Sequence, residues 1–279
     1  MHFDWYQATI EAHPMALLDA VKSDAGDQAD RVDHGNGRHN YANSSRLLDL
    51  EGGRIVEVLH GGSNGTPNLA ASGIYAGPVS ETVRRLWPVH RVSRVDVCED
   101  MVGDGLFDHL EGVCRTIGRQ FRIKGTTILP DDPADGSTYY LGAKTSNVRL
   151  RLYDKTAEAR SKLTPDRHSE IPDHWARLEI QFRPKKQTKE IVADMTPETI
   201  WGCSPWTREI ASQAMTLDVD RINPQAGWKP DQERALRAMC LQYKRHLEAL
   251  VERVGSWEAA GAHLGDLVRD GSERGAQRL

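Results

Sequence analysis

One stretch of the chain could hold a nucleophile beside cations. Leu150 and Leu152 alternate there with Arg151, Tyr153 and Lys155. This period of two predicts a half-buried β-strand whose polar face carries the last three side chains. A neutral phenol is a weak nucleophile, and a nearby cation favours the phenolate. The stretch therefore predicts a phosphate-binding strand in which Tyr153 is the candidate nucleophile and Lys155 its cationic neighbour.

Two further strands carry carboxylates in their interiors. Residues 92–100 alternate around Asp96 and end at Asp100, and residues 175–183 alternate around Glu179. An acidic residue in mid-strand goes against β-propensity and needs a cation or an arginine beside it. An ion pair on a solvated sheet face would also explain each carboxylate, so both interpretations stay open here.

A metal site follows if the three strands are neighbours, because side chains on adjacent strands come within roughly 5 Å of each other. Two carboxylates with a water shell suit Mg²⁺ or Mn²⁺, which would polarise a phosphoryl oxygen. Asp96 and Glu179 form the expected primary pair. Asp100 lies four residues from Asp96, roughly 13 Å along a strand, and is expected to be an auxiliary ligand. Attack by Tyr153 would produce a phosphotyrosine ester.

Positive charge gathers around these strands although the whole chain has a net charge of −4. Residues 144–189 contain twelve Lys/Arg and six Asp/Glu, so this region is +6 and the remainder is −10. Local charge of this kind suits phosphate binding, although chance clustering on a solvated face is an equally good explanation. The expected DNA contacts come from basic and amide side chains of this region and of the first carboxylate strand: Arg94, Lys144, Asn147, Arg149, Arg151, Arg177 and Arg183.

The elements that would position these residues indicate an α+β fold. A mostly antiparallel central sheet, with helices on one face, is expected to be followed by a helical C-terminal region. The predicted division is a catalytic domain over residues 1–190 and a helical region over residues 191–279 that binds DNA or a second copy. Residues 24–44 and 61–76 are rich in Gly, Asn, Asp or Ser and are predicted to be loops. Residues 231–254 form the most regular predicted helix, with an apolar seam at coiled-coil spacing.

Several classes of protein are excluded by composition. No apolar run approaches the length of a membrane span, and the first residues lack the features of a secretory signal. The four cysteines are far apart, which fits reduced thiols in a cytoplasm. The eleven histidines include no His-x-His pair, so a carboxylate site would have to replace histidine metal ligands.

These motifs together resemble the Rep-trans type of rolling-circle replication initiators over about residues 92–183. The matching segments occur in the family's order: Arg94–Asp100, Tyr140–Gly142 with Ser146 and Asn147, Arg151–Lys155, and Trp175–Glu179. The resemblance implies that Tyr153 is the nucleophile and that Asp96 and Glu179 match the family's acidic positions. Where the family often has Arg after the glycine step, this chain has Ala143 and Lys144.

The function that the resemblance implies is nicking and rejoining of one strand of a double-strand origin through a 5′-phosphotyrosine, leaving a 3′-OH primer. It also implies binding of single-stranded DNA, a homodimer and recruitment of a host helicase. Two alternatives remain: a non-catalytic DNA-binding regulator, and a metal-dependent phosphodiesterase that uses water. The source of the replicon, phage, plasmid or integrative element, does not follow from the sequence.

Overall fold

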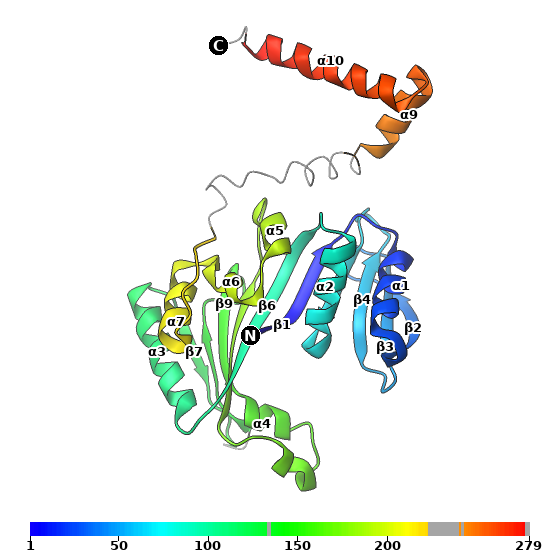
Figure 1. Ribbon diagram of the computed structural model, residues 1–279. Coiled ribbons are helices and arrows are strands. Elements are labelled where there is room, and N and C mark those ends of the chain that lie inside the picture. The colour runs from blue at the N-terminus through cyan, green and yellow to red at the C-terminus, as the bar shows by residue number, and fades with distance from the viewer. Residues whose placement is uncertain (133–134, 223–239, 241–242, 277–279) are drawn as a thin grey trace. The chain divides into compact units, whose positions relative to one another are not determined.

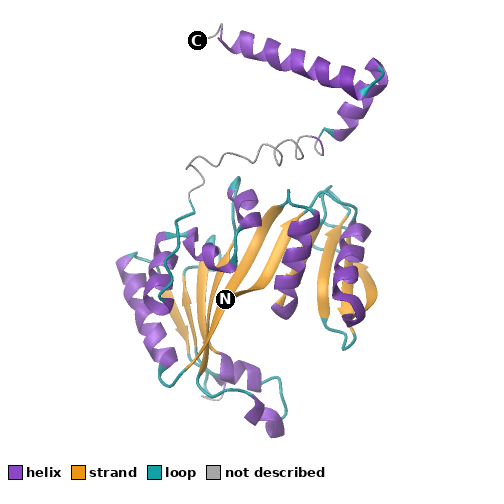
Figure 2. Ribbon diagram, in the orientation of Figure 1, coloured by secondary structure: helices purple, strands orange, loops and turns teal. Residues whose placement is uncertain are grey.

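The structure, a computed structural model, describes residues 1–132, 135–222, 240 and 243–276. The chain divides into two compact units, Met1–Gly227 and Trp228–Leu279. The first unit contains the sheet and the helices that cover it (Figure 1). The second unit contains helices (Figure 2).

A ten-stranded sheet forms the body of the first unit, and its strands pair antiparallel in the order β2-β3-β4-β5-β1-β6-β10-β9-β8-β7. The strands are β1 His2–Thr9, β2 Ala29–Asn36, β3 Asn43–Asp49, β4 Arg54–His60, β5 Asn68–Ser72, β6 Arg91–Val102, β7 Gly125–Ile128, β8 Thr138–Leu141, β9 Val148–Asp154 and β10 Trp175–Phe182. The three strands that carry the candidate chemistry are consecutive in space, with β10 between β6 and β9.

Helices pack against the sheet along its length: α2 contacts β1, α3 contacts β8, β9 and β10, and α6 contacts β6. The helices of this unit are α1 Pro14–Ala25, α2 Ala76–Leu86, α3 Leu106–Gln120, α4 Lys155–Arg160, α5 Thr188–Ile191, α6 Pro197–Ile200 and α7 Pro205–Met215. The predicted α+β class with a mostly antiparallel sheet is therefore confirmed.

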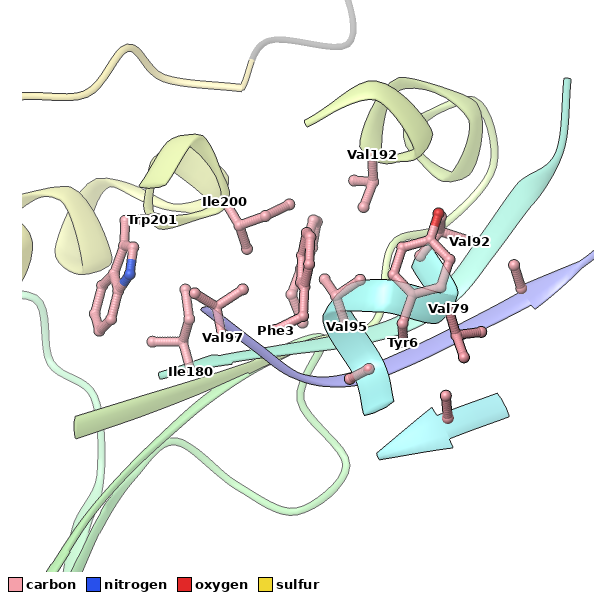
Figure 3. Packing of buried hydrophobic residues seen from close by; sticks show 14 of the residues in the cluster. Phe3, Tyr6, Val79, Val92, Val95, Val97, Ile180, Val192, Ile200 and Trp201 are labelled. Atoms are coloured by element: carbon pink, nitrogen blue, oxygen red, sulfur yellow. The ribbon is translucent and has the colours of Figure 1, made fainter. Parts of the chain in front are cut away.

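One face of the sheet is apolar because apolar residues alternate along β9 and β10 and in the middle of β6. Val95 and Val97 of β6 and Ile180 of β10 are fully buried there. They pack with Phe3, Trp201 and other side chains in one hydrophobic cluster (Figure 3). Trp201 follows α6 and has no exposed surface, so the first unit continues well beyond residue 190. The intervening residues of the strands therefore line the opposite face, here called the polar face.

Two strands lie in segments that the sequence predicts to be loops. β2 is an edge strand whose residues are almost all exposed, so it carries no apolar alternation. β5 has the sequence Asn-Leu-Ala-Ala-Ser, which lacks the β-branched and aromatic residues that mark a strand, yet it is nearly all buried between β4 and β1. Pairing with neighbouring strands stabilises both segments, and the local sequence does not reveal such pairing. The prediction of loops was therefore wrong for Ala29–Asn36 and for Asn68–Ser72.

The second unit contains two described helices, α9 Lys244–Val254 and α10 Trp257–Ala276, which contact each other. Ser256 accepts a hydrogen bond from the Ala259 amide at 3.2 Å and so caps α10. Of the helix predicted over residues 231–254, the first part lies outside the described residues except for Cys240. Within the described part of the chain, no helix combines the length and the apolarity that crossing a membrane requires.

Candidate active site on the polar face

The register of the three strands arranges the predicted site residues in rows across the polar face. Tyr153 of β9 is opposite Arg177 of β10, which is opposite Asp100 of β6. In the next row Glu179 lies between Arg151 and Cys98. The third row carries Arg149, Gln181 and Asp96. Rows on one face are roughly 7 Å apart, so each row is within side-chain reach of the next.

Asp96 and Glu179 line the same pocket, which has a volume of about 190 Å³. Asp96 is 3% exposed and accepts a hydrogen bond from the Arg94 Nε at 2.9 Å, while Glu179 is 6% exposed and accepts one from Arg151 at 2.7 Å. The remaining lining residues come from β1, β8, β9 and β10: Asp4, Trp5, Tyr140, Arg149, Leu150 and Gln181. The primary carboxylate pair expected from the sequence therefore shares one pocket, and each carboxylate already has an arginine beside it.

Asp4 is a third carboxylate of this pocket that the sequence did not indicate. β1 and β6 shift register between Phe3 and Trp5, and this β-bulge brings both Asp4 and Trp5 to the pocket. Strict alternation would instead have placed Trp5 on the same face as Phe3, which is buried in the core. The only signal in the sequence is an acidic residue inside an apolar and aromatic first strand.

The pocket lining holds three carboxylates, Asp4, Asp96 and Glu179, and three arginines that balance their formal charge. Burial raises the pKa of Glu179, Arg151 lowers it, and the negative charges of Asp96 and Asp4 raise it again. Burial likewise raises the pKa of Asp96 against the effect of Arg94, with Asp4 adding to the rise. Repulsion among three carboxylates is relieved when a divalent cation binds between them. The oxygen donors of these three residues therefore fit Mg²⁺ or Mn²⁺.

Asp100 is held outside this pocket by Arg177. The Nε and one terminal nitrogen of Arg177 each donate to Asp100 at 2.7 Å, and the other terminal nitrogen donates to Asp4 at 2.9 Å. The indole of Trp175 also donates to Asp100, at 2.9 Å. Asp100 therefore orients Arg177, and Arg177 connects the row of Tyr153 to the carboxylate pocket.

A second group of potential ligands adjoins Asp100. His2, Asp4 and Cys98 offer ligand atoms that all lie within 4.8 Å of one another. The His2 Nε2 lies 3.0 Å from the Cys98 Sγ. Burial raises the pKa of the Cys98 thiol, and the neighbouring carboxylates do the same, so the metal-binding thiolate is disfavoured. Among these side chains Asp4 is therefore the one that fits a hard cation.

Tyr153 is buried, with 6% of its surface exposed, and cations flank its ring. The Arg151 guanidinium carbon lies 4.2 Å from the ring centre and the Lys155 Nζ lies 5.7 Å from it. Burial raises the pKa of Tyr153 well above its usual value, and the positive charges of Arg177 and Arg151 offset only part of that rise. Lys155 donates to Glu158 at 2.5 Å, so its charge is shared with a carboxylate.

Two arginines of β9, Arg149 and Arg151, line the pocket. The Nε atoms of Arg149 and Arg151 are buried and have no hydrogen-bond partner within the described residues. The Arg149 guanidinium also stacks on Tyr140, with 3.8 Å between its central carbon and the ring centre. Guanidinium groups bind phosphate oxygens well, so two arginines in the lining suit a pocket that receives a phosphate.

The remaining predicted DNA contacts lie at one end of the strands. Arg183 follows β10, its amide donates to the Asn147 carbonyl at 2.7 Å, and its guanidinium is 3.5 Å from the Lys144 carbonyl. Burial and the charges of Arg94 and Arg149 lower the pKa of Arg183. The structure thus groups Lys144, Asn147 and Arg183 beside the pocket, at the opposite end from Tyr153.

A family model described as replication initiation factor matches residues 91–232, half of the chain. The chain belongs to this family, Rep_trans, and the resemblance noted from the motifs is confirmed. Among solved structures, the chain is similar to a rolling circle replication initiator protein from Geobacillus stearothermophilus, with a TM-score of 0.49 and 16% identity over 72% of this chain and 82% of that one. No curated protein is detectably similar to the chain in sequence.

Proposed function

We propose that the protein nicks and rejoins one DNA strand at a replication origin, starting rolling-circle replication through a covalent 5′-phosphotyrosine at Tyr153. The family match supports a replication initiator, which must act on DNA. The observation that carries the nicking chemistry is the pocket lined by Asp96, Glu179, Arg149 and Arg151. Glu179 and Arg151 are one row of side chains from Tyr153, and Asp96 and Arg149 are two rows from it.

The proposed reaction transfers a phosphoryl group between two oxygens. The Tyr153 oxygen forms a bond to the scissile phosphorus while the bond from phosphorus to the 3′ oxygen breaks, and the phenolic proton ends on the released 3′-OH. Arg149 and Arg151 would donate hydrogen bonds to the non-bridging oxygens, whose charge grows in the transition state. Arg177, oriented by Asp100, would stabilise the phenolate as it forms.

Asp96, Glu179 and Asp4 would hold Mg²⁺ or Mn²⁺, and Asp100 acts through Arg177 in this scheme. When bound, the cation supplies Lewis-acid polarisation of the phosphate. Lys155 would contribute positive charge above the Tyr153 ring. Arg94, Arg183, Lys144 and Asn147 would position the strand at the far end of the pocket.

A denaturing gel tests the proposal directly. Single-stranded origin DNA and Mn²⁺ should give a covalent protein–DNA adduct with the wild type and none with Tyr153→Phe. Tyr139→Phe is the matched control, because this buried tyrosine also has an arginine over its ring but does not line the pocket, so the adduct should stay intact. Asp96→Asn and Glu179→Gln should abolish cleavage while retaining binding.

The burial of Tyr153 favours a second candidate, a metal-dependent phosphodiesterase that uses water. Cleavage that persists in Tyr153→Phe would establish that candidate instead of the first. Binding without any cleavage would support a non-catalytic DNA-binding regulator.

The assembly around the catalytic unit is part of the same proposal. A homodimer and a host helicase as partner are expected from the resemblance, and a cytoplasmic location from the widely spaced cysteines. Helices α9 and α10 of the second unit would bind origin DNA or a second copy. Sedimentation of the protein with and without origin DNA tests the dimer.

A further inference from the structure

A buried carboxylate organises three arginines on the polar face of the N-terminal strands. Glu57 of β4 has no exposed surface and accepts two hydrogen bonds from Arg38, at 2.6 and 2.5 Å. It also accepts one from Arg46 at 3.0 Å and one from Arg54 at 3.4 Å. Ser44 donates a further bond at 2.7 Å. The Glu57 carboxylate is therefore surrounded by donors and orients the three guanidinium groups.

This group is strongly positive at its surface. Three guanidiniums against one carboxylate leave two net positive charges, and the arginine side chains are 42%, 48% and 31% exposed, in the order Arg38, Arg46 and Arg54. Burial raises the pKa of Glu57, but the bonds from Arg38, Ser44 and Arg46 bring it down to about 2. The carboxylate stays ionised and covered, so the exposed groups of this cluster are donors for an anion.

The cluster is connected to the catalytic pocket through Trp5. Sheet register places Glu57 in the same row as Ala70, Gln7 and Arg94, so the cluster and the pocket share the polar face. The Arg54 guanidinium carbon lies 5.9 Å from the Trp5 ring centre, and that of Arg94 lies 4.4 Å from it. Trp5 is itself part of the pocket lining. A half-buried aromatic ring thus lies between two groups of arginines.

We propose that this face is a binding track for single-stranded DNA, in which Arg38, Arg46 and Arg54 grip phosphates and Trp5 stacks on a base. Arginines along a groove combined with aromatic rings are the usual means of binding a single strand without reading its sequence. The inference rests on the proposed function for its ligand, DNA, and adds a site outside residues 91–232, the part that matches the family.

The dimensions of the sheet set the length of the track. Five strand spacings separate β4 from β9, which is about 24 Å at the usual distance between strands. About seven stacked nucleotides cover that distance. The N-terminal arginines would therefore hold the strand several nucleotides away from the phosphate that lies beside Tyr153.

The test is the salt dependence of binding to a 20-nucleotide oligothymidylate, measured by fluorescence anisotropy in EDTA so that no cleavage occurs. The slope of log K against log salt concentration is negative, and each phosphate contact that is lost reduces its magnitude by about 0.7. Arg38→Gln/Arg46→Gln should reduce this magnitude by about 1.4, and Arg46→Gln alone by about 0.7 if the double variant does not fold. Trp5→Leu should weaken binding about tenfold through lost stacking.

Arg85→Gln is the matched control, since it removes an exposed arginine from helix α2. Its slope and affinity should equal those of the wild type. Unchanged slopes in Arg46→Gln and in a folded double variant, or an equal loss in Arg85→Gln, would overturn the track. Nicking by Tyr153 is measured separately. If the variants alter the salt slope but the wild type does not nick DNA, the proposed function is wrong and the track stands. If the wild type nicks DNA but the variants leave the salt slope unaltered, the track is wrong and the proposed function stands.

Discussion

Asp4 and Arg177 are 173 residues apart in the chain and are joined by a hydrogen bond of 2.9 Å. The bond links the bulge in β1 to the first half of β10, and the same guanidinium holds Asp100 on β6. Three neighbouring strands are thus connected through one side chain, of which 11% is exposed. This arrangement makes Arg177 important for stability as well as for the site.

Replacing Arg177 should be strongly destabilising. In Arg177→Met, Asp4 and Asp100 would keep their charges without their common partner, and breaking a buried pair in this way typically costs about 3 kcal/mol or more. The free energy of unfolding from urea titration measures the effect. Arg177→Lys should recover only part of the loss because lysine lacks the fork that reaches both carboxylates. Arg85→Gln, whose partner Asp24 is at the surface, should hardly change the unfolding midpoint. A stable Arg177→Met would contradict this role.

The polar face illustrates what alternation in a sequence can predict. Asp96, Glu179 and Tyr153 were assigned to one face because apolar residues alternate around them, and β6, β10 and β9 are indeed neighbours. Alternation fails where the backbone does not keep a period of two. The bulge in β1 brings both Asp4 and Trp5 to the pocket. Strict alternation would have placed these two adjacent residues on opposite faces of the sheet.

The hydrogen-bond partners of the carboxylates also could not be predicted from the sequence. Three strand interiors with arginines and acids predict ion pairs, but not which pairs form. Asp100 was expected to assist a metal, and it instead accepts hydrogen bonds from Arg177 and Trp175. Its role as a metal ligand stays a prediction. Long-range register decides such pairings, and register between strands separated by 75 residues or more is not encoded locally.

Divalent cations should stabilise the protein through the three carboxylates of the pocket. At a Mn²⁺ concentration about 100 times Kd, binding to the folded state alone would add about 2.7 kcal/mol. Thermal unfolding should therefore shift upward with Mn²⁺ in the wild type, and the shift should shrink in Asp4→Asn and Glu179→Gln. Asp19→Asn, an exposed change on α1, is the control and should keep the full shift. An undiminished shift in Asp4→Asn would remove this residue from the site.

Formation of the covalent adduct should accelerate as the pH rises. Burial raises the pKa of Tyr153, so below that value the reactive phenolate is the minor form. If the proton leaves before attack, the single-turnover rate should rise about tenfold per pH unit between roughly pH 6.5 and 9. Quenched-flow measurement of the adduct on a denaturing gel gives this profile. A rate that is flat over this range would indicate that the proton is not lost before the bond to phosphorus forms.

Acid should remove the contribution of Glu57 to stability. Its folded pKa of about 2 lies below the usual 4.5, so the ionised carboxylate stabilises the fold fully above about pH 4.5, and this stabilisation is lost as the pH falls through 2. The difference of about 2.5 pH units corresponds to about 3 kcal/mol. Glu57→Gln should therefore be less stable than the wild type by about that amount at pH 7, with the gap narrowing below pH 4.5. Urea unfolding of both proteins at pH 7, 4 and 3 measures the gap, and a gap that stays constant with pH would mean that the arginines do not act on the carboxylate charge.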